Sequence, residues 1–207
     1  MTEQKGELLL SSYGFASPIM REKYAKVLEG KDLKNQVCAV LPYTAKNPER
    51  VFESEKRGLV EFGFDPNGVI MIRSRHDLVR RVPDYLYVPG GDPFLLLRTV
   101  RELGIVRDLA RCVREEGTVY VGVSAGADLA TENIEYVRRL ESDEHLSSGN
   151  CDALGLLADN VLCHADARDD GTKIACKVAG GKPMIYIRND QLVHVLDGRW
   201  EYAGEEE

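Results

Sequence analysis

A serine flanked by glycines carries the most specific chemical signal in this sequence. Ser124 lies in Gly122-Val123-Ser124-Ala125-Gly126, the GxSxG spacing of a nucleophile elbow. A strand-like run at 118–121 precedes it, and a helix-like run at 127–130 follows it. In this motif the serine lies on a strained turn, and the glycines let neighbouring backbone pass close by. The pattern predicts a serine hydrolase with Ser124 as the nucleophile.

Such a serine needs N–H groups that stabilise the oxyanion formed during acyl transfer. Ala125 opens the following helix, where backbone N–H groups have no partner within the helix. Gly90-Gly91 ends the preceding strand-like run and stands before Asp92-Pro93, a strong helix start. We expect these two glycine clusters to meet at the site, although ordinary tight turns are the alternative.

A serine hydroxyl also needs a base within hydrogen-bond reach, and the chain has four histidines. His164 ends the strand-like run 161–163, so we expect it at the same sheet edge as Ser124. A structural role is the alternative for a histidine at a strand end, and its pairing with the elbow favours the catalytic role. The other three are expected at the surface: His76, His145 and His194.

The elements that must position these residues alternate along the chain in a pattern typical of βαβ units. Strands are predicted at 7–10, 37–41, 69–72, 85–88, 119–123, 161–163, 184–187 and 192–196. The last of these follows Asn189-Asp190 and is expected to form half of a terminal hairpin. Helices are predicted at 18–29, 49–62, 93–103, 106–115 and 125–131. We therefore expect an α/β fold, a three-layer sandwich with a mostly parallel central sheet and helices on both faces.

Composition favours one soluble domain over residues 1–207. The formal net charge of -7 disfavours nucleic acid as a partner. No apolar run approaches the roughly 20 residues of a membrane span, and the first residues do not have the pattern of an export signal. We expect a cytoplasmic location and no membrane contact. The five cysteines contain no CxxC pair, so buried thiols are expected and no metal site is predicted.

Taken together, these stretches resemble peptidase family S51, the group of peptidase E (aspartyl dipeptidase) and cyanophycinase. The resemblance is carried by VPGGDPF with LLL at 88–97, VGVSAGA at 121–127, LGL at 154–156 leading to NVLCH at 160–164, and LSSYGF at 10–15. It implies a class I glutamine amidotransferase-like (flavodoxin-like) fold. It also implies Ser124 as the nucleophile, His164 as the base, and Gly91 with Ala125 as the oxyanion hole. Amidotransferases of this fold have cysteine at the elbow, so Ser124 favours hydrolysis.

Two features of the family have no clear match in this chain. The triad acid, an Asp at the end of a Thr-rich segment, has no equivalent in register. We take Glu141 as the candidate, with Glu135 and Asp166 as alternatives, and a solvated surface role is open for each. The family's arginine that holds the substrate's aspartate carboxylate is matched only by the candidates Arg168 and Lys173. Aspartates at 166, 169 and 170 could equally favour a basic substrate or a free amine.

The sequence therefore predicts a dipeptidase E-like serine exopeptidase that hydrolyses short peptides through an acyl-enzyme on Ser124, with selectivity for N-terminal Asp as an option. The expected partner is a small peptide substrate, and no cofactor is expected. Two alternatives are another serine hydrolase, such as an esterase or a cyanophycinase-like enzyme, and a catalytically silent binding domain. The silent domain is favoured if no acid orients His164. The oligomeric state is not fixed by the sequence, and a homodimer is one of the open arrangements.

Overall fold

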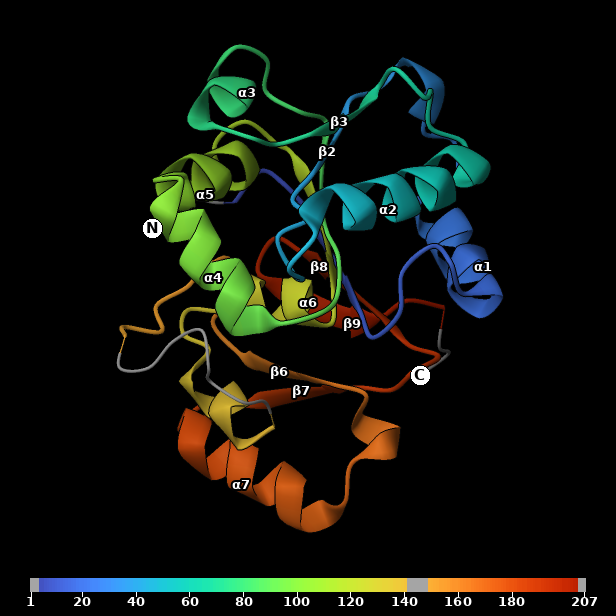
Figure 1. Cartoon of the computed structure of the whole chain (residues 1–207). Coiled ribbons are helices and arrows are strands. Elements are labelled where there is room, and N and C mark those ends of the chain that lie inside the picture. Colours follow the sequence, from blue (N-terminus) through green and yellow to red (C-terminus); the bar gives the residue numbers. More distant parts are fainter. Residues whose placement is uncertain (1–3, 141–148, 205–207) are drawn as a thin grey trace.

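A seven-stranded sheet forms the centre of the computed structural model, which describes residues 4–140 and 149–204 (Figure 1). Its strand order is β3-β2-β4-β5-β1-β8-β9. The strands are β1 Leu8–Ser11, β2 Cys38–Val40, β3 Val69–Met71, β4 Tyr85–Val88, β5 Val119–Val123, β8 Leu192–Leu196 and β9 Arg199–Tyr202. The first five run parallel to one another, while β8 is antiparallel to β1 and β9 to β8. The predicted mostly parallel sheet is confirmed.

Helices cover both faces of this sheet, as predicted. One face packs against α1 Pro18–Val27 and α2 Pro48–Phe62, and the other against α4 Pro93–Glu102, α5 Val106–Arg114 and α6 Ala125–Ala130 (Figure 1). In β1, Leu8 and Leu10 enter one hydrophobic core and Leu9 enters the other. Successive strand side chains point to opposite faces, so a strand buried on both faces is a continuous apolar run.

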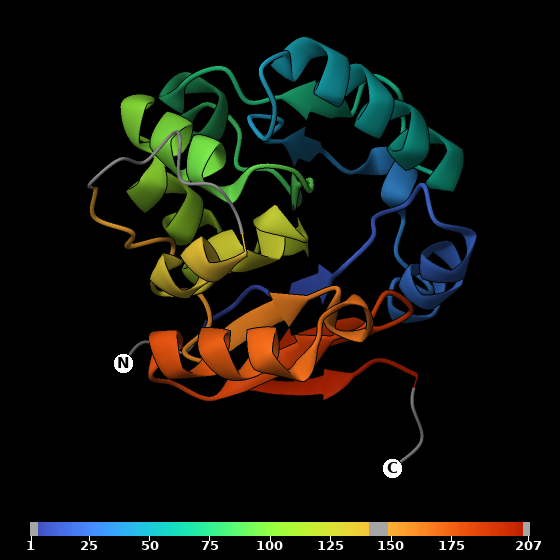
Figure 2. The ribbon, with the colours of Figure 1, turned by 60° about the horizontal axis from the view of Figure 1, so that its bottom comes forward.

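The segment that carries His164 lies outside the central sheet. Strands β6 Asn160–Cys163 and β7 Met184–Ile187 pair in parallel as a separate two-stranded sheet, and α7 Asp170–Gly180 lies against them (Figure 2). The expectation that His164 shares one sheet edge with Ser124 is therefore wrong. His164 approaches the elbow from a neighbouring layer.

Helix α7 was not predicted because its apolar residues do not form a buried stripe. Ile174 and Val178 are 62% and 75% exposed, and Cys176 is its only buried residue. The local signal is the N-cap, where the side chain of Asp169 accepts a hydrogen bond from the Thr172 N–H at 2.9 Å. The short helix α3 Arg75–Val79 was not predicted either, although Ser74 and Asp77 form a capping box at its start. The described residues also form three 3₁₀ segments: η1 Leu33–Asn35, η2 Glu135–Arg139 and η3 Ala165–Ala167.

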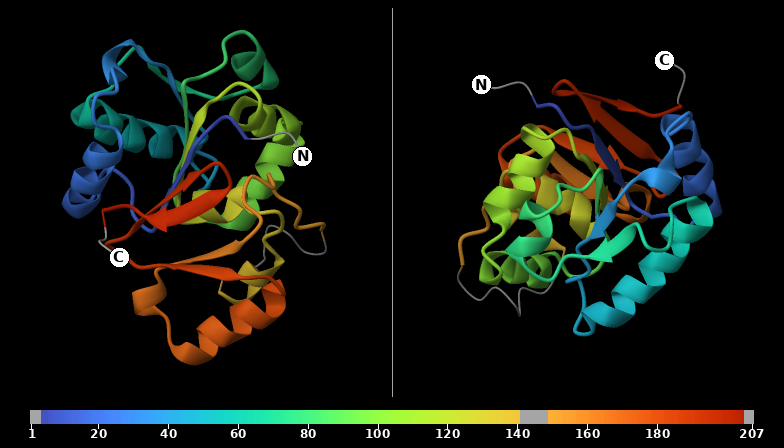
Figure 3. Two further views of the ribbon diagram at one scale, coloured as in Figure 1. Left: turned by 180° about the vertical axis from the view of Figure 1, so that it is seen from behind. Right: turned by 90° about the horizontal axis from the view of Figure 1, so that it is seen from above.

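The terminal hairpin is formed by β8 with β9, a strand that was not predicted. Asp197 and Gly198 connect the two strands and have φ values of 50° and 72°. Two positive φ values are what a two-residue type I′ turn requires, and Asp-Gly is a preferred pair there. Figure 3 shows this hairpin, in red, at the margin of the central sheet. In the part of the chain that is described, no helix has both the length and the apolarity to cross a bilayer.

Candidate active site

Ser124 lies on a strained turn between β5 and α6. Its φ of 49° and ψ of -109° are unusual for a residue with a side chain, as expected for a nucleophile elbow. The glycines on either side are required by close approaches. A Cβ on Gly126 would lie 2.1 Å from the carbonyl oxygen of Val88, and one on Gly122 would lie 2.7 Å from the carbonyl oxygen of Gly126. The elbow therefore packs backbone to backbone against β4.

His164 reaches Ser124 from the end of β6. Its Nε2 lies 3.2 Å from Ser124 Oγ, within hydrogen-bond reach. The backbone N–H of His164 donates to Ser12 Oγ at 2.9 Å, and Ser12 Oγ donates to the carbonyl oxygen of Ile187 at 3.0 Å. The N–H of Ser124 donates to the carbonyl oxygen of Ser11 at 2.8 Å. The end of β1 thus holds the elbow, the end of β6 and the end of β7 together.

The third group in line with the serine and histidine is an amide. Asn189 Oδ1 lies 2.7 Å from His164 Nδ1. An amide oxygen only accepts hydrogen bonds, so Nδ1 carries the proton and Nε2 presents its lone pair to Ser124. Tyr13, which is 49% exposed, packs edge-on against the imidazole with ring centroids 5.2 Å apart. The arrangement has the order nucleophile, base and orienting group of a catalytic triad.

Neither of the two acid candidates that the structure describes, Glu135 and Asp166, contacts the imidazole. Glu141 lies outside the described residues. Glu135 is at the surface in an ion pair with Arg138 at 2.9 Å. Asp166 accepts the backbone N–H of Asn189 at 3.1 Å, so it supports the residue that contacts the imidazole.

Sequence reasoning missed Asn189 because Asn189-Asp190 has the composition of an ordinary turn. The position of Asn189 beside His164 can be predicted only once the pairing of β6 with β7 is known. Cys163 lies opposite Ile187 in that pair, so the residues just after each strand lie side by side. Asn189 then falls next to His164.

The glycines predicted for the oxyanion hole border the nucleophile. A Cβ on Gly90 would lie 3.2 Å from Ser124 Cβ, so this turn passes directly beside the serine. Gly91 has a φ of 139°, and a Cβ there would lie 2.4 Å from the carbonyl oxygen of Thr44. The same carbonyl oxygen accepts the N–H of Asp92 at 2.9 Å, which fixes the turn. Ala125 is the first residue of α6, immediately after the nucleophile.

The two candidate substrate cations differ in their surroundings. Lys173 is on α7 and pairs with Asp170 at 3.4 Å. Arg168 follows η3, and its Nε is buried with no hydrogen-bond partner in the described part of the chain. The charge of Arg168 acts on the buried thiols of Cys163 and Cys176. Arg168 is therefore the candidate with unused hydrogen-bonding capacity.

The thiol next to the base is not a competing nucleophile. Burial, with a smaller contribution from the charge of Asp128, raises the pKa of Cys163 well above its ordinary value. A thiol with so high a pKa stays protonated at neutral pH and is a poor nucleophile. All five cysteines are buried and unpaired, as expected. Among residues 4–140 and 149–204, no three His, Cys, Asp or Glu side chains gather so as to hold a metal ion.

A buried tyrosine ties the helix of the nucleophile to the strand of the base. The Tyr136 hydroxyl donates to Asp128 Oδ1 at 3.3 Å, and Asp128 lies one turn after Ser124 on α6. The same hydroxyl oxygen accepts the N–H of Val161 in β6 at 3.3 Å. Burial, with the charge of Asp128 as the next cause, raises the pKa of Tyr136 well above its ordinary value. This neutral bridge helps to fix the separation of Ser124 and His164.

Fold and site together define a flavodoxin-like α/β protein with a nucleophile elbow and an adjoining histidine. The chain belongs to peptidase family S51, whose model matches residues 8–202. It is 29% identical over 123 residues to an uncharacterized peptidase of Listeria monocytogenes, which is 56% of this chain and 58% of that protein. It is also 29% identical over 136 residues to a Drosophila melanogaster protein named as a probable alpha-aspartyl dipeptidase. The aligned segment covers 65% of this chain and 56% of that protein.

A solved structure supports the fold. It is a candidate peptidase E from Listeria monocytogenes, and it matches with a TM-score of 0.76 at 20% identity over 95% of this chain and 97% of that chain. At that identity the match shows the fold alone. The alignments to the two sequence relatives span little more than half of each relative's length. Together, these comparisons show the family and the fold of this chain.

Proposed function

We propose that this protein is a serine-type exopeptidase that hydrolyses short peptides through an acyl-enzyme on Ser124. One observation carries the proposal: His164 contacts both other residues, with Nε2 3.2 Å from Ser124 Oγ and Nδ1 2.7 Å from Asn189 Oδ1. This geometry lets His164 Nε2 take the hydroxyl proton while Oγ attacks a carbonyl carbon. The peptide C–N bond then breaks as His164 passes that proton to the leaving amine. Water, deprotonated by His164, next attacks the acyl carbon; the bond from that carbon to Ser124 Oγ breaks, His164 returns the proton to Oγ, and the acid is released.

The oxyanion of each tetrahedral intermediate is proposed to accept hydrogen bonds from Ala125 and Gly91. Ala125 begins α6, and the N–H groups of a first helical turn have no partner within the helix. Gly90-Gly91 passes next to the serine without side chains to block the approach. Removal of one such donor typically costs about 10²–10³ in kcat.

The finer part of the proposal concerns the substrate's N-terminal residue. An Asp side chain is a carboxylate, and a planar guanidinium binds a carboxylate through two hydrogen bonds. Arg168 has a buried Nε without a partner among the described residues, whereas Lys173 is already paired with Asp170. We therefore assign recognition of the Asp carboxylate to Arg168. A relative named for an alpha-aspartyl dipeptidase supports the same substrate class.

A catalytically silent binding domain is the second candidate function, and Asn189 is the observation that favours it. A neutral amide fixes the tautomer of His164 but adds no negative charge to stabilise the imidazolium that forms during acyl transfer. The two candidates differ in whether Ser124 is nucleophilic. They can therefore be separated without knowing the substrate.

A fluorophosphonate probe tests the serine mechanism. We expect stoichiometric labelling of the wild-type protein and none of Ser124→Ala or His164→Ala. The Lys173→Ala variant is the folded control and should label normally. Absence of wild-type labelling, together with no hydrolysis of a peptide and ester panel, would favour the silent domain.

Substrate selectivity is tested by kcat/KM on Asp-X dipeptides against matched Asn-X dipeptides. Loss of one side of a desolvated ion pair commonly costs about 2–5 kcal/mol, so Arg168→Ala should lower the Asp preference by at least about 30-fold. Lys173→Ala should retain it. An equal rate on the two substrate series in the wild type would remove the aspartyl assignment and leave the serine mechanism untouched.

A further inference from the structure

The terminal hairpin leaves one edge of the central sheet open. β9 is the last strand in the sheet order, and within the described residues only β8 pairs with it. Arg199, Trp200 and Glu201 of this strand are all exposed. An edge strand presents backbone N–H and C=O groups that a further strand can pair with.

The ladder between β8 and β9 determines which backbone groups face outward. The N–H of Ala203 donates to the carbonyl oxygen of Leu192 at 2.7 Å, so these opposed residues form a hydrogen-bonded pair. Hydrogen-bonded and non-hydrogen-bonded pairs alternate along an antiparallel ladder. Trp200, opposite Val195, is three positions back and therefore belongs to a non-hydrogen-bonded pair. Its N–H and C=O consequently point away from β8, toward the open edge.

We propose that β9 pairs antiparallel with β9 of a second copy of this chain, with the two Trp200 residues opposite each other. In that register Arg199 lies opposite the partner's Glu201, and Glu201 lies opposite the partner's Arg199. Neither Arg199 nor Glu201 has an ion pair within the described part of the chain. The two charge pairs fall at non-hydrogen-bonded positions, where opposed side chains come closest.

Charge also selects this register over its neighbours. A shift of two residues in one direction places Arg199 opposite the partner's Arg199, and a shift in the other direction places Glu201 opposite the partner's Glu201. Like charges directly opposite each other are destabilising. A shift of one residue moves the outward-pointing backbone groups of Trp200 out of line. The Arg-Trp-Glu order is therefore self-complementary in one antiparallel register.

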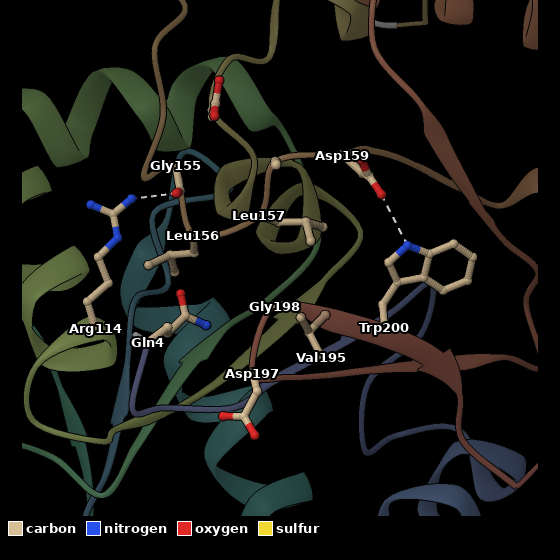
Figure 4. Close-up of a pocket in the computed structure, with 12 residues that line it drawn as sticks. Gln4, Arg114, Gly155, Leu156, Leu157, Asp159, Val195, Asp197, Gly198 and Trp200 are labelled. Carbon is tan, nitrogen blue, oxygen red and sulfur yellow. Dashed lines mark hydrogen bonds between the residues drawn. The ribbon is translucent and has the colours of Figure 1, made fainter. Parts of the chain in front are cut away.

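Trp200 is already ordered for this contact. Its indole Nε1 donates to Asp159 Oδ2 at 3.1 Å (Figure 4). The ring forms one wall of a cavity of about 730 Å³ that is also lined by Leu156, Leu157 and Val195. The side chain is 39% exposed, and pairing would cover it at little cost in side-chain entropy because its position is already fixed. This cavity lies at the amino ends of the parallel strands, away from Ser124, so the proposal is independent of the activity.

Sedimentation velocity of the full chain between about 1 µM and about 300 µM tests the pairing, because two four-residue edge strands form a small contact, and small contacts dissociate in that range. Trp200 is the only tryptophan, so the shift of intrinsic emission with concentration reports on the same contact. We expect a reversible dimer. Arg199→Glu and Glu201→Arg each place like charges opposite each other, and each should raise the dimer dissociation constant at least about tenfold.

The decisive measurement mixes the two single variants. Arg199→Glu makes both charged positions of β9 acidic and Glu201→Arg makes both basic, so an equimolar mixture restores two opposite-charge pairs and should form a heterodimer. The double variant Arg199→Glu with Glu201→Arg should form a homodimer again. Circular dichroism confirms that each variant is folded. A monomeric wild type over the whole range, single variants that dimerise like the wild type, or a mixture of folded variants that stays monomeric would each overturn the proposal.

Discussion

Replacement of Asn189 measures how much a neutral orienting group contributes to this site. Its Oδ1 lies 2.7 Å from His164 Nδ1, and Nε2 of the same ring lies 3.2 Å from Ser124 Oγ. During attack the imidazole becomes an imidazolium, so the bond to Asn189 becomes a charge-assisted one. A hydrogen bond to a charged group contributes about 1.5–3 kcal/mol. At 1.36 kcal/mol per factor of ten, Asn189→Ala should lower kcat by roughly 10- to 150-fold.

Asn189→Asp changes the same contact in the opposite direction. A carboxylate at that position favours the charged imidazole, so kcat should equal or exceed that of the wild type. The same negative charge stabilises the protonated imidazolium of His164 relative to the neutral ring. Since the base must be neutral to accept a proton, the acidic limb of the kcat/KM profile should move to higher pH than in the wild type.

Steady-state hydrolysis of a short peptide over a range of pH is the assay, with Asp190→Ala as the matched control. Asp190 is the next residue of the same turn, and it pairs with Arg188 at 3.2 Å rather than with His164. The control should keep wild-type kcat. The reasoning is refuted if Asn189→Ala remains within about threefold of the wild type, or if Asn189→Asp leaves the acidic limb in place.

Three further predictions concern the surroundings of the site. Ser12→Ala leaves the buried N–H of His164 without its acceptor, so it should cost about 1–3 kcal/mol in the free energy of unfolding and lower kcat more than it raises KM. Gly126→Ala should destabilise the folded protein by about 1–3 kcal/mol because the new Cβ has no room. Gly58→Ala in α2 should stabilise it by about 0.5–1 kcal/mol, because the nearest atom to a Cβ there lies at 3.8 Å and alanine favours the helix. Denaturant unfolding measures both changes. Burial raises the pKa of Glu55, so the folded state binds this proton more tightly than the unfolded chain does. The free energy of unfolding should therefore fall as the pH rises through the ordinary pKa of Glu and above it. Glu55→Gln should reduce this dependence of stability on pH, as measured by Tm from about pH 4 to pH 7.

The strained turn at Ser124 could be predicted because everything that defines it is local. Strand β5, the elbow and α6 are contiguous in the chain, and the glycine spacing reports a backbone approach to β4 that only glycine allows. The central sheet could be predicted for a similar reason, since strands buried on both faces are continuous apolar runs. Helix α7 is harder to predict, because its aliphatic residues Ile174 and Val178 are exposed and a cysteine is its buried residue, so its apolar residues do not mark the face that packs.

His164 was identified through the end of its strand, although that strand belongs to another layer. His164 nevertheless lies beside Ser124 because the end of β1 holds both segments: the Ser11 carbonyl oxygen accepts the N–H of Ser124, and the Ser12 hydroxyl accepts the N–H of His164. This connection joins residues more than 100 positions apart in the chain. No local pattern reports it.

The third position of the triad differs from the first two in how strongly the backbone constrains it. Ser124 and His164 both have positive φ values, and the backbone N–H of each donates a hydrogen bond at the end of β1, to the Ser11 carbonyl oxygen and to the Ser12 hydroxyl, so neither position can move without disturbing the end of this strand. Asn189 contributes one side-chain hydrogen bond from a surface turn, and any residue with an acceptor oxygen of similar reach could make it. The acceptor's identity is therefore free to vary at little cost to folding, while the positions of the serine and histidine are not. For this reason the sequence motif predicts an acid as a residue type, whereas the structure defines a position beside His164 Nδ1 that an amide also fits.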